Sequence, residues 1–122
     1  MKLYILGCGD AFGSGGRNNS GYLLEAREPL FLLDCGPTTL AAMKRAGFNP
    51  KRLDAIFLSH LHGDHYGGVP FFLLDDLYEN PRDRALKVAG PPGTDRRVHD
   101  LFQFMFGDAE HPKKLPRLNS IF

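Results

Sequence analysis

The stretch Leu53-Asp54-Ala55-Ile56-Phe57-Leu58, followed by Ser59-His60-Leu61-His62-Gly63-Asp64-His65, decides the fold of this chain. Its first part is mostly apolar, which predicts a buried strand. The second part places three imidazoles and a carboxylate within residues 60–65. Because sites in α/β proteins lie beyond the carboxyl ends of strands, this order predicts a functional site at the end of the strand.

The spacing of these side chains favours metal binding. Imidazole and carboxylate are ligands of Zn²⁺, and they also suit Mn and Fe. His60 and His62 are two residues apart, so on an extended segment both rings can reach one ion. Gly63 would let the chain bend back and aim Asp64 and His65 at a second ion. Two ions about 3.5–4 Å apart can hold an attacking hydroxide and a leaving oxygen together. The alternative is a motif that has lost its metal.

The motif His-x-His-x-Asp-His at residues 60–65 resembles that of the metallo-β-lactamase superfamily. The segments LGCGDA (6–11), RNNS (17–20) and LLDCG (32–36) resemble its tRNase Z-like branch, and the similarity extends to about residue 94. The resemblance implies an α/β (α+β) fold, the metallo-β-lactamase-like αββα sandwich, present here as its first half, a mixed β-sheet with outer helices. PTTL at 37–40 replaces the family's Glu-Gly-Thr-Gln, which weakens the case for tRNA processing.

The resemblance also implies a metal-dependent hydrolase of phosphodiesters, either RNA or a cyclic nucleotide-type substrate. His60 and His62 would hold one ion, and Asp64 and His65 the other, with Zn as the expected metal. Asp64 would also orient the water nucleophile or take its proton, since a bound metal lowers the pKa of water to about 7. Lactones, thioesters and β-lactams remain alternative substrates on the same fold.

Asp34 follows an apolar segment, and a carboxylate there can accept the free N–H of a metal-bound histidine. On physical grounds alone, a turn or helix-start role fits equally well. The resemblance favours the supporting role, because the family places an aspartate at this point. Asp10, in a glycine-rich loop at residues 7–16, is assigned a minor role at most.

The number of ligands is too small for two ions. Two ions need five or six donors, and the motif supplies four. His99 is expected to point outward, and His111 lies in a polar segment as a weaker candidate. We therefore expect residues 1–122 to form one domain truncated at its C-terminal side. The alternatives are a small protein that pairs two halves in a dimer, and a non-catalytic half-domain that associates through its exposed sheet as a homo-oligomer.

Composition sets few limits on function. The chain has 122 residues and a net charge of +1, which argues neither for nor against a nucleic-acid partner. No apolar run approaches the roughly 20 residues of a membrane helix, and the N-terminus does not resemble a signal peptide, so we expect a cytoplasmic protein. Cys8 and Cys35 are interpreted as reduced packing residues, although a thiolate could also bind Zn²⁺.

Hydrophobic periodicity predicts the remaining elements. Strands are expected at residues 3–6, 20–26, 30–33 and 86–89, and helices at 37–46, 68–78 and 95–106. Thr94 is expected to cap the last helix. Its buried face is expected to consist of Val98, Leu101, Phe102 and Met105.

Overall fold

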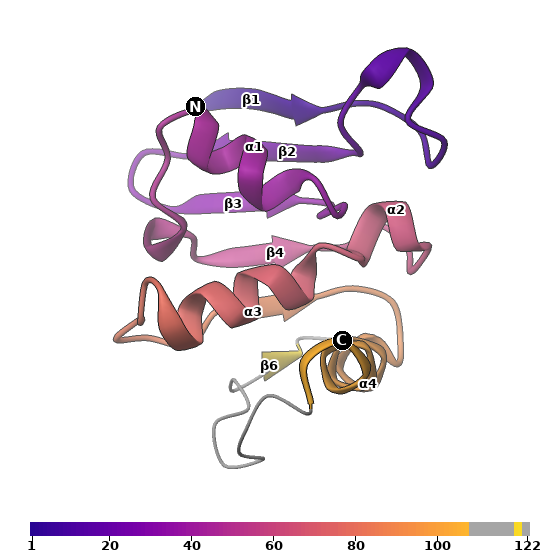
Figure 1. Ribbon diagram of the computed structural model, residues 1–122. Coiled ribbons are helices and arrows are strands. Elements are labelled where there is room, and N and C mark those ends of the chain that lie inside the picture. Colours follow the sequence, from indigo (N-terminus) through magenta and orange to yellow (C-terminus); the bar gives the residue numbers. More distant parts are fainter. Residues whose placement is uncertain (108–118, 121–122) are drawn as a thin grey trace.

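The computed structural model describes residues 1–107 and 119–120. Its strands form one mixed sheet in the order β1 to β6 (Figure 1). The strands are β1 (Lys2–Gly7), β2 (Gly21–Glu25), β3 (Leu30–Leu33), β4 (Ala55–Phe57), β5 (Lys87–Ala89) and β6 (Asn119–Ser120). The helices are α1 (Thr39–Arg45), α2 (Gly63–Tyr66), α3 (Val69–Tyr78) and α4 (Thr94–Phe106), with short 3₁₀ turns η1 (Ser14–Gly16) and η2 (Pro50–Arg52). No helix within these described ranges is long and apolar enough to span a membrane.

The sheet changes from antiparallel to parallel at β3. Strands β1, β2 and β3 are antiparallel, and the expected hairpin between β2 and β3 is confirmed. Strands β3, β4, β5 and β6 run parallel. The carboxyl ends of β3 and β4 therefore lie side by side at one edge of the sheet. This arrangement brings the segment that begins at Asp34 next to the histidine motif.

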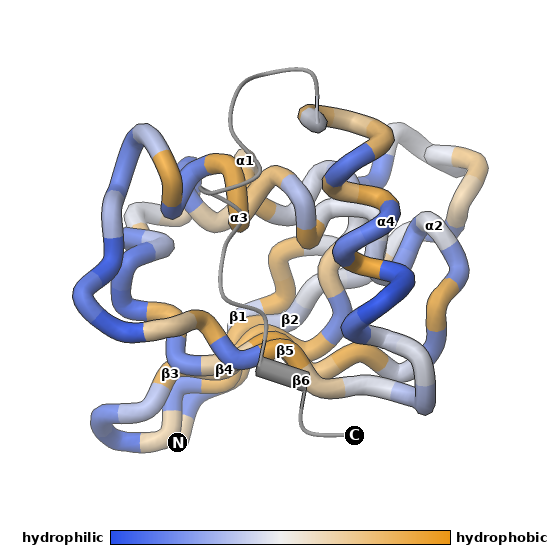
Figure 2. Tube along the Cα trace, turned by 90° about the horizontal axis from the view of Figure 1, so that it is seen from below, coloured by the Kyte–Doolittle hydropathy of each residue, from blue (hydrophilic) through white to orange (hydrophobic). Residues whose placement is uncertain are grey.

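The helices cover one face of the sheet (Figures 1 and 2). On that face the register aligns Leu23, Leu32, Ile56 and Val88, all at most 2% exposed. These side chains belong to one hydrophobic cluster that also includes residues of α1, α3 and α4. The core therefore lies between the sheet and the helices.

The opposite face of the sheet is open and apolar. Leu3 and Ile5 are 57% and 64% exposed, and Phe57 is 37% exposed. Phe31 pairs with Phe57 edge to face at 5.5 Å between ring centroids, beside a hollow that both residues line. Among the described residues no helix covers this face, as Figure 2 shows. The exposed sheet that the half-domain alternative assumes is therefore present in the described part of the chain.

Two expectations for α4 were wrong. The helix is preceded by Gly93, whose φ of 87° suits glycine, and not by Thr94. Thr94 is buried, and its hydroxyl donates to the Pro91 carbonyl at 2.6 Å. Met105 is 39% exposed, whereas Phe106 packs against Phe102 at 5.6 Å. The buried stripe therefore continues through Phe106, four residues after Phe102, in place of Met105.

The strand and helix boundaries differ by a few residues from the expected ones. The helix expected at 37–46 begins at Thr39, and the strand expected at 53–58 is regular only from Ala55 to Phe57. His111 and the apolar pair at 121–122 lie outside the described residues.

A close backbone contact joins the segment after β3 to the start of α3. The Gly68 N–H donates to the Cys35 carbonyl at 2.9 Å. A Cβ on Gly68 would lie 2.0 Å from the Gly36 carbonyl oxygen, whereas one on Gly63 would have no atom within 4 Å.

We expect Gly68→Ala to lower the free energy of unfolding by about 2–3 kcal/mol, because the new methyl group forces two backbone segments apart. Gly63→Ala is the matched control and should leave stability unchanged or slightly raised, since alanine favours a helix more than glycine does. Chemical denaturation of both variants measures the difference. Equal stability of the two variants would contradict this account of the contact.

Candidate metal centre

The histidine motif begins where β4 ends. Residues 59–62 have no regular structure, and His62 is extended with φ −75° and ψ 147°. The chain then turns into α2, which carries Asp64 and His65, and the His65 N–H donates to the His62 carbonyl at 2.9 Å. Gly63 is not among the residues with positive φ. The bend therefore comes from the start of a helix, and the expected need for glycine at this point was wrong.

The four side chains of the motif lie close together. The ring centroid of His60 is 4.7 Å from that of His62 and 4.1 Å from that of His65. His65 Nε2 is 3.2 Å from an Asp64 carboxylate oxygen. In the described part of the chain, however, no three His, Cys, Asp or Glu side chains are arranged so that they could hold one ion. The four side chains of the motif are thus neighbours, but no three of them converge on one ion.

Asp34 lies directly beside the motif. Its φ is 58°, a left-handed conformation that aspartate tolerates better than most residues. The Asp34 N–H donates to the Phe57 carbonyl at 2.8 Å, which fixes the turn against the end of β4. One carboxylate oxygen lies 2.9 Å from His65 Nδ1. The contact is the kind expected of a carboxylate that orients a metal-binding imidazole.

Cys35 connects the same two segments through its backbone. Its N–H donates to the His65 carbonyl at 2.7 Å, and its side chain is 0% exposed. Burial, together with the charge of Asp34, raises the pKa of the Cys35 thiol well above its ordinary value. Cys8 is exposed. The packing role is thus apparent for Cys35 but not for Cys8.

Two residues beside the motif were given no role by the sequence analysis. The Ser59 hydroxyl contacts the Asp34 carboxylate and His60, and its place directly before the first histidine was a usable signal. Arg97 on α4 donates to the Leu61 carbonyl at 3.5 Å and lies over the Tyr66 ring. No local sequence pattern predicts a role for Arg97, because its contacts form only when α4 packs against the segment that contains Leu61 and Tyr66. Tyr66 is 8% exposed and belongs to the core.

Asp10 bonds within its own loop. Its carboxylate accepts from the Ser14 hydroxyl at 2.6 Å and from the Phe12 and Ser14 N–H groups. The hydrogen bonds from Ser14 lower the pKa of Asp10. His99 is exposed on α4, as expected.

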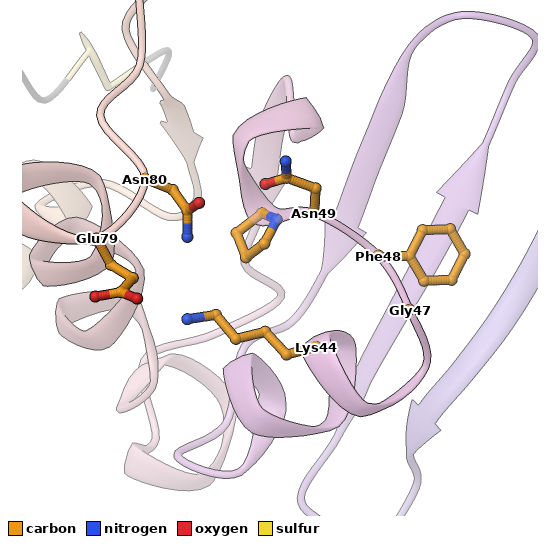
Figure 3. A pocket seen from close by; sticks show the side chains of 7 residues that line it. Lys44, Gly47, Phe48, Asn49, Glu79 and Asn80 are labelled. Atoms are coloured by element: carbon orange, nitrogen blue, oxygen red, sulfur yellow. The ribbon is translucent and has the colours of Figure 1, made fainter.

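A hollow at the C-terminal ends of α1 and α3 lies away from the motif (Figure 3). Lys44, on α1, and Glu79, directly after α3, point toward it. Lys44 Nζ is 2.5 Å from the buried carboxylate of Asp75, which already balances the positive charge of the lysine. Asn80 also donates to Asp75. The ion pair between Lys44 and Asp75 therefore links α1 to α3 at this hollow.

Comparison with known protein families assigns the chain to one of them. Residues 1–105 match the family described as Anti-Pycsar protein Apyc1. The chain belongs to this Apyc1 family. The match includes the histidine motif, Asp34 and Ser59, so the geometry described above concerns residues inside the Apyc1 match.

The individual proteins to which this member of the Apyc1 family is similar include several named Ribonuclease Z. Ribonuclease Z of Methanothermobacter thermautotrophicus is 35% identical over 103 residues, which cover 84% of this chain and 32% of the relative. Ribonuclease Z of Methanocaldococcus jannaschii is 35% identical over 115 residues, covering 94% and 36%. The chain spans about a third of the length of these relatives.

Solved structures agree with the sequence comparison. The short form of human tRNase Z superposes with a TM-score of 0.74 at 28% identity, covering 89% of this chain and 40% of that one. The metallo-β-lactamase fold protein YhfI from Bacillus subtilis superposes with a TM-score of 0.66 at 24% identity, covering 98% of this chain and 46% of that one. The mixed sheet with helices on one face thus matches the metallo-β-lactamase fold. The expected membership of the tRNase Z-like branch of that superfamily is confirmed.

We expect alkylating reagents to modify Cys8 but not Cys35 in the folded protein at neutral pH, because a buried thiol with a raised pKa stays protonated. Mass spectrometry after iodoacetamide treatment, with and without denaturant, measures the difference. As the pH rises above 9.0, the ordinary pKa of a cysteine thiol, Cys35 loses its proton in the unfolded chain before it does so in the folded protein. The buried Cys35 should therefore lower the free energy of unfolding in that pH range. Equal modification of both thiols in the folded protein would contradict the prediction.

Proposed function

We propose that this chain supplies the metal-binding strand end and loop of a metal-dependent phosphodiester hydrolase. His60 and His62 would hold one divalent ion, and Asp64 and His65 a second, with Asp34 as the orienting carboxylate. Zn²⁺ is the favoured metal, and Mn and Fe also suit these donors. Two ions need five or six donors, so this proposal requires one or two ligands besides the four of the motif.

One contact carries the metal assignment. His65 Nδ1 lies 2.9 Å from Asp34 and therefore bears the hydrogen of that bond, because a carboxylate can only accept. The other nitrogen of a neutral His65 then presents a lone pair 3.2 Å from an Asp64 carboxylate oxygen. Two acceptors this close need a proton or a cation between them. A divalent cation satisfies both atoms, and its chemistry matches the donor set.

The residues of the chain have distinct tasks in this proposal. Asp34 fixes the ring orientation of His65, which leaves its Nε2 free for an ion. Asp64, at the first turn of α2, can orient the attacking water or accept its proton. When bound, the metal pair supplies hydroxide near neutral pH.

RNA is the substrate class that the relatives favour, since those matched are named Ribonuclease Z. Cyclic nucleotide-type phosphodiesters are retained because they need the same bond cleavage, and lactones or thioesters are less well supported. PTTL at 37–40 continues to weaken the case for tRNA itself as substrate. We place the activity in the cytoplasm, and we retain the expectation of a homo-oligomer.

A second candidate function is association without catalysis. The open sheet face, with Leu3 and Ile5 more than half exposed, favours it. So does the lack, within residues 1–107 and 119–120, of a group of three side chains that could hold an ion. In this case the chain is a half-domain that binds metal weakly and pairs through its sheet. The extent of the domain, residues 1–122 as a truncated sandwich, likewise stays a prediction.

His62→Ala should lower both metal content and turnover of bis(p-nitrophenyl) phosphate by roughly 100-fold or more, since even outer-sphere partners of a ligand are worth 10–100-fold. Elemental analysis of purified protein measures the metal, and absorbance of nitrophenolate measures turnover. His99→Ala, which changes an exposed histidine on α4, is the control and should alter neither quantity.

The two candidates predict opposite results for the unmodified protein. Bound metal and turnover, both dependent on His62, support the hydrolase. A soluble oligomer without metal and without turnover would overturn it and favour the half-domain.

A further inference from the structure

The Ser59 hydroxyl lies between Asp34 and His60. Its oxygen is 2.9 Å and 2.8 Å from the two carboxylate oxygens of Asp34, and 3.0 Å from His60 Nδ1. The Ser59 N–H also donates to the same carboxylate at 2.8 Å. Ser59 therefore keeps a backbone bond to Asp34 that does not depend on its side chain.

Counting hydrogens assigns the direction of each bond. A hydroxyl carries one hydrogen, and a carboxylate carries none. If that hydrogen pointed to His60, the Ser59 oxygen would face two carboxylate oxygens with no hydrogen between them. The hydroxyl must therefore donate to Asp34. His60 Nδ1 must then carry the hydrogen that bridges to Ser59, which in the neutral ring leaves the lone pair of His60 on Nε2.

We propose that Ser59 is a positioning residue that holds His60 in its Nδ1–H tautomer and presents Nε2 to a metal ion. This inference rests on the proposed function. One carboxylate then orients two rings, His65 directly and His60 through the Ser59 hydroxyl. Ser59 itself touches neither metal nor substrate in this scheme.

Ser59→Ala removes the hydroxyl and keeps the backbone bond to Asp34, so the loop should still fold. Ser59→Thr keeps a hydroxyl at this exposed position and is the conservative variant that should behave like the unmodified protein. The matched control is Ser14→Ala, because Ser14 also donates its hydroxyl to an aspartate, Asp10, but outside the motif.

The first measurement is the tautomer of His60, read from imidazole ¹⁵N chemical shifts in chelator-treated protein. We expect the Nδ1–H form in the unmodified protein, in Ser59→Thr and in Ser14→Ala, and a mixture of tautomers in Ser59→Ala. The second is Zn²⁺ affinity by competition with a chelating dye. We expect it to fall about tenfold in Ser59→Ala, the scale of outer-sphere effects, and to stay within about twofold in the other two variants.

The two measurements separate this inference from the proposed function. An unchanged His60 tautomer in Ser59→Ala would overturn the role of Ser59, whatever the protein binds. A tautomer change together with no Zn²⁺ binding by the unmodified protein would overturn the metal-directed part of the role and the metal site itself. A loss of affinity in Ser59→Thr equal to that in Ser59→Ala would show that the hydroxyl is not the cause.

Discussion

The candidate site depends on one carboxylate, that of Asp34. It lies directly after β3, and its oxygens accept bonds from Ser59 and His65 in the segment after β4. Its own N–H donates to the end of β4. Because β3 and β4 are parallel neighbours, these two segments leave the sheet at the same edge. The carboxylate thus converts the adjacency of two strands into a fixed orientation of imidazole rings.

The sequence predicted most of what depends on local pattern. The alternating and continuous apolar runs located the strands and helices, and the spacing of His60, His62 and His65 indicated the candidate site. The aspartate after β3 was identified as a neighbour of the motif, although physics alone left its role open. The chemistry of the donors needed no structure, because metal preference follows from residue type.

What the sequence could not predict depends on tertiary contacts or on backbone geometry. Phe106 packs against the core and contacts Phe71 of α3, a contact between two helices that the sequence of α4 alone does not specify. Arg97 reaches the Leu61 carbonyl across more than 30 intervening residues. The role of Thr94 changed because Gly93 adopts a positive φ and takes the capping position. The sequence also did not show that, within the described residues, no three His, Cys, Asp or Glu side chains are arranged to hold one ion, because this depends on side-chain placement.

The open apolar face of the sheet has a consequence for how the chain behaves after synthesis. Leu3, Ile5 and Phe57 present a surface to which any other apolar surface can adhere. If a segment of the same molecule covers this face, the rate does not depend on protein concentration. Adhesion between two newly made molecules is second order, so its rate rises with their concentration. The yield of correctly assembled protein therefore depends on the competition between these two processes, and high expression favours aggregation.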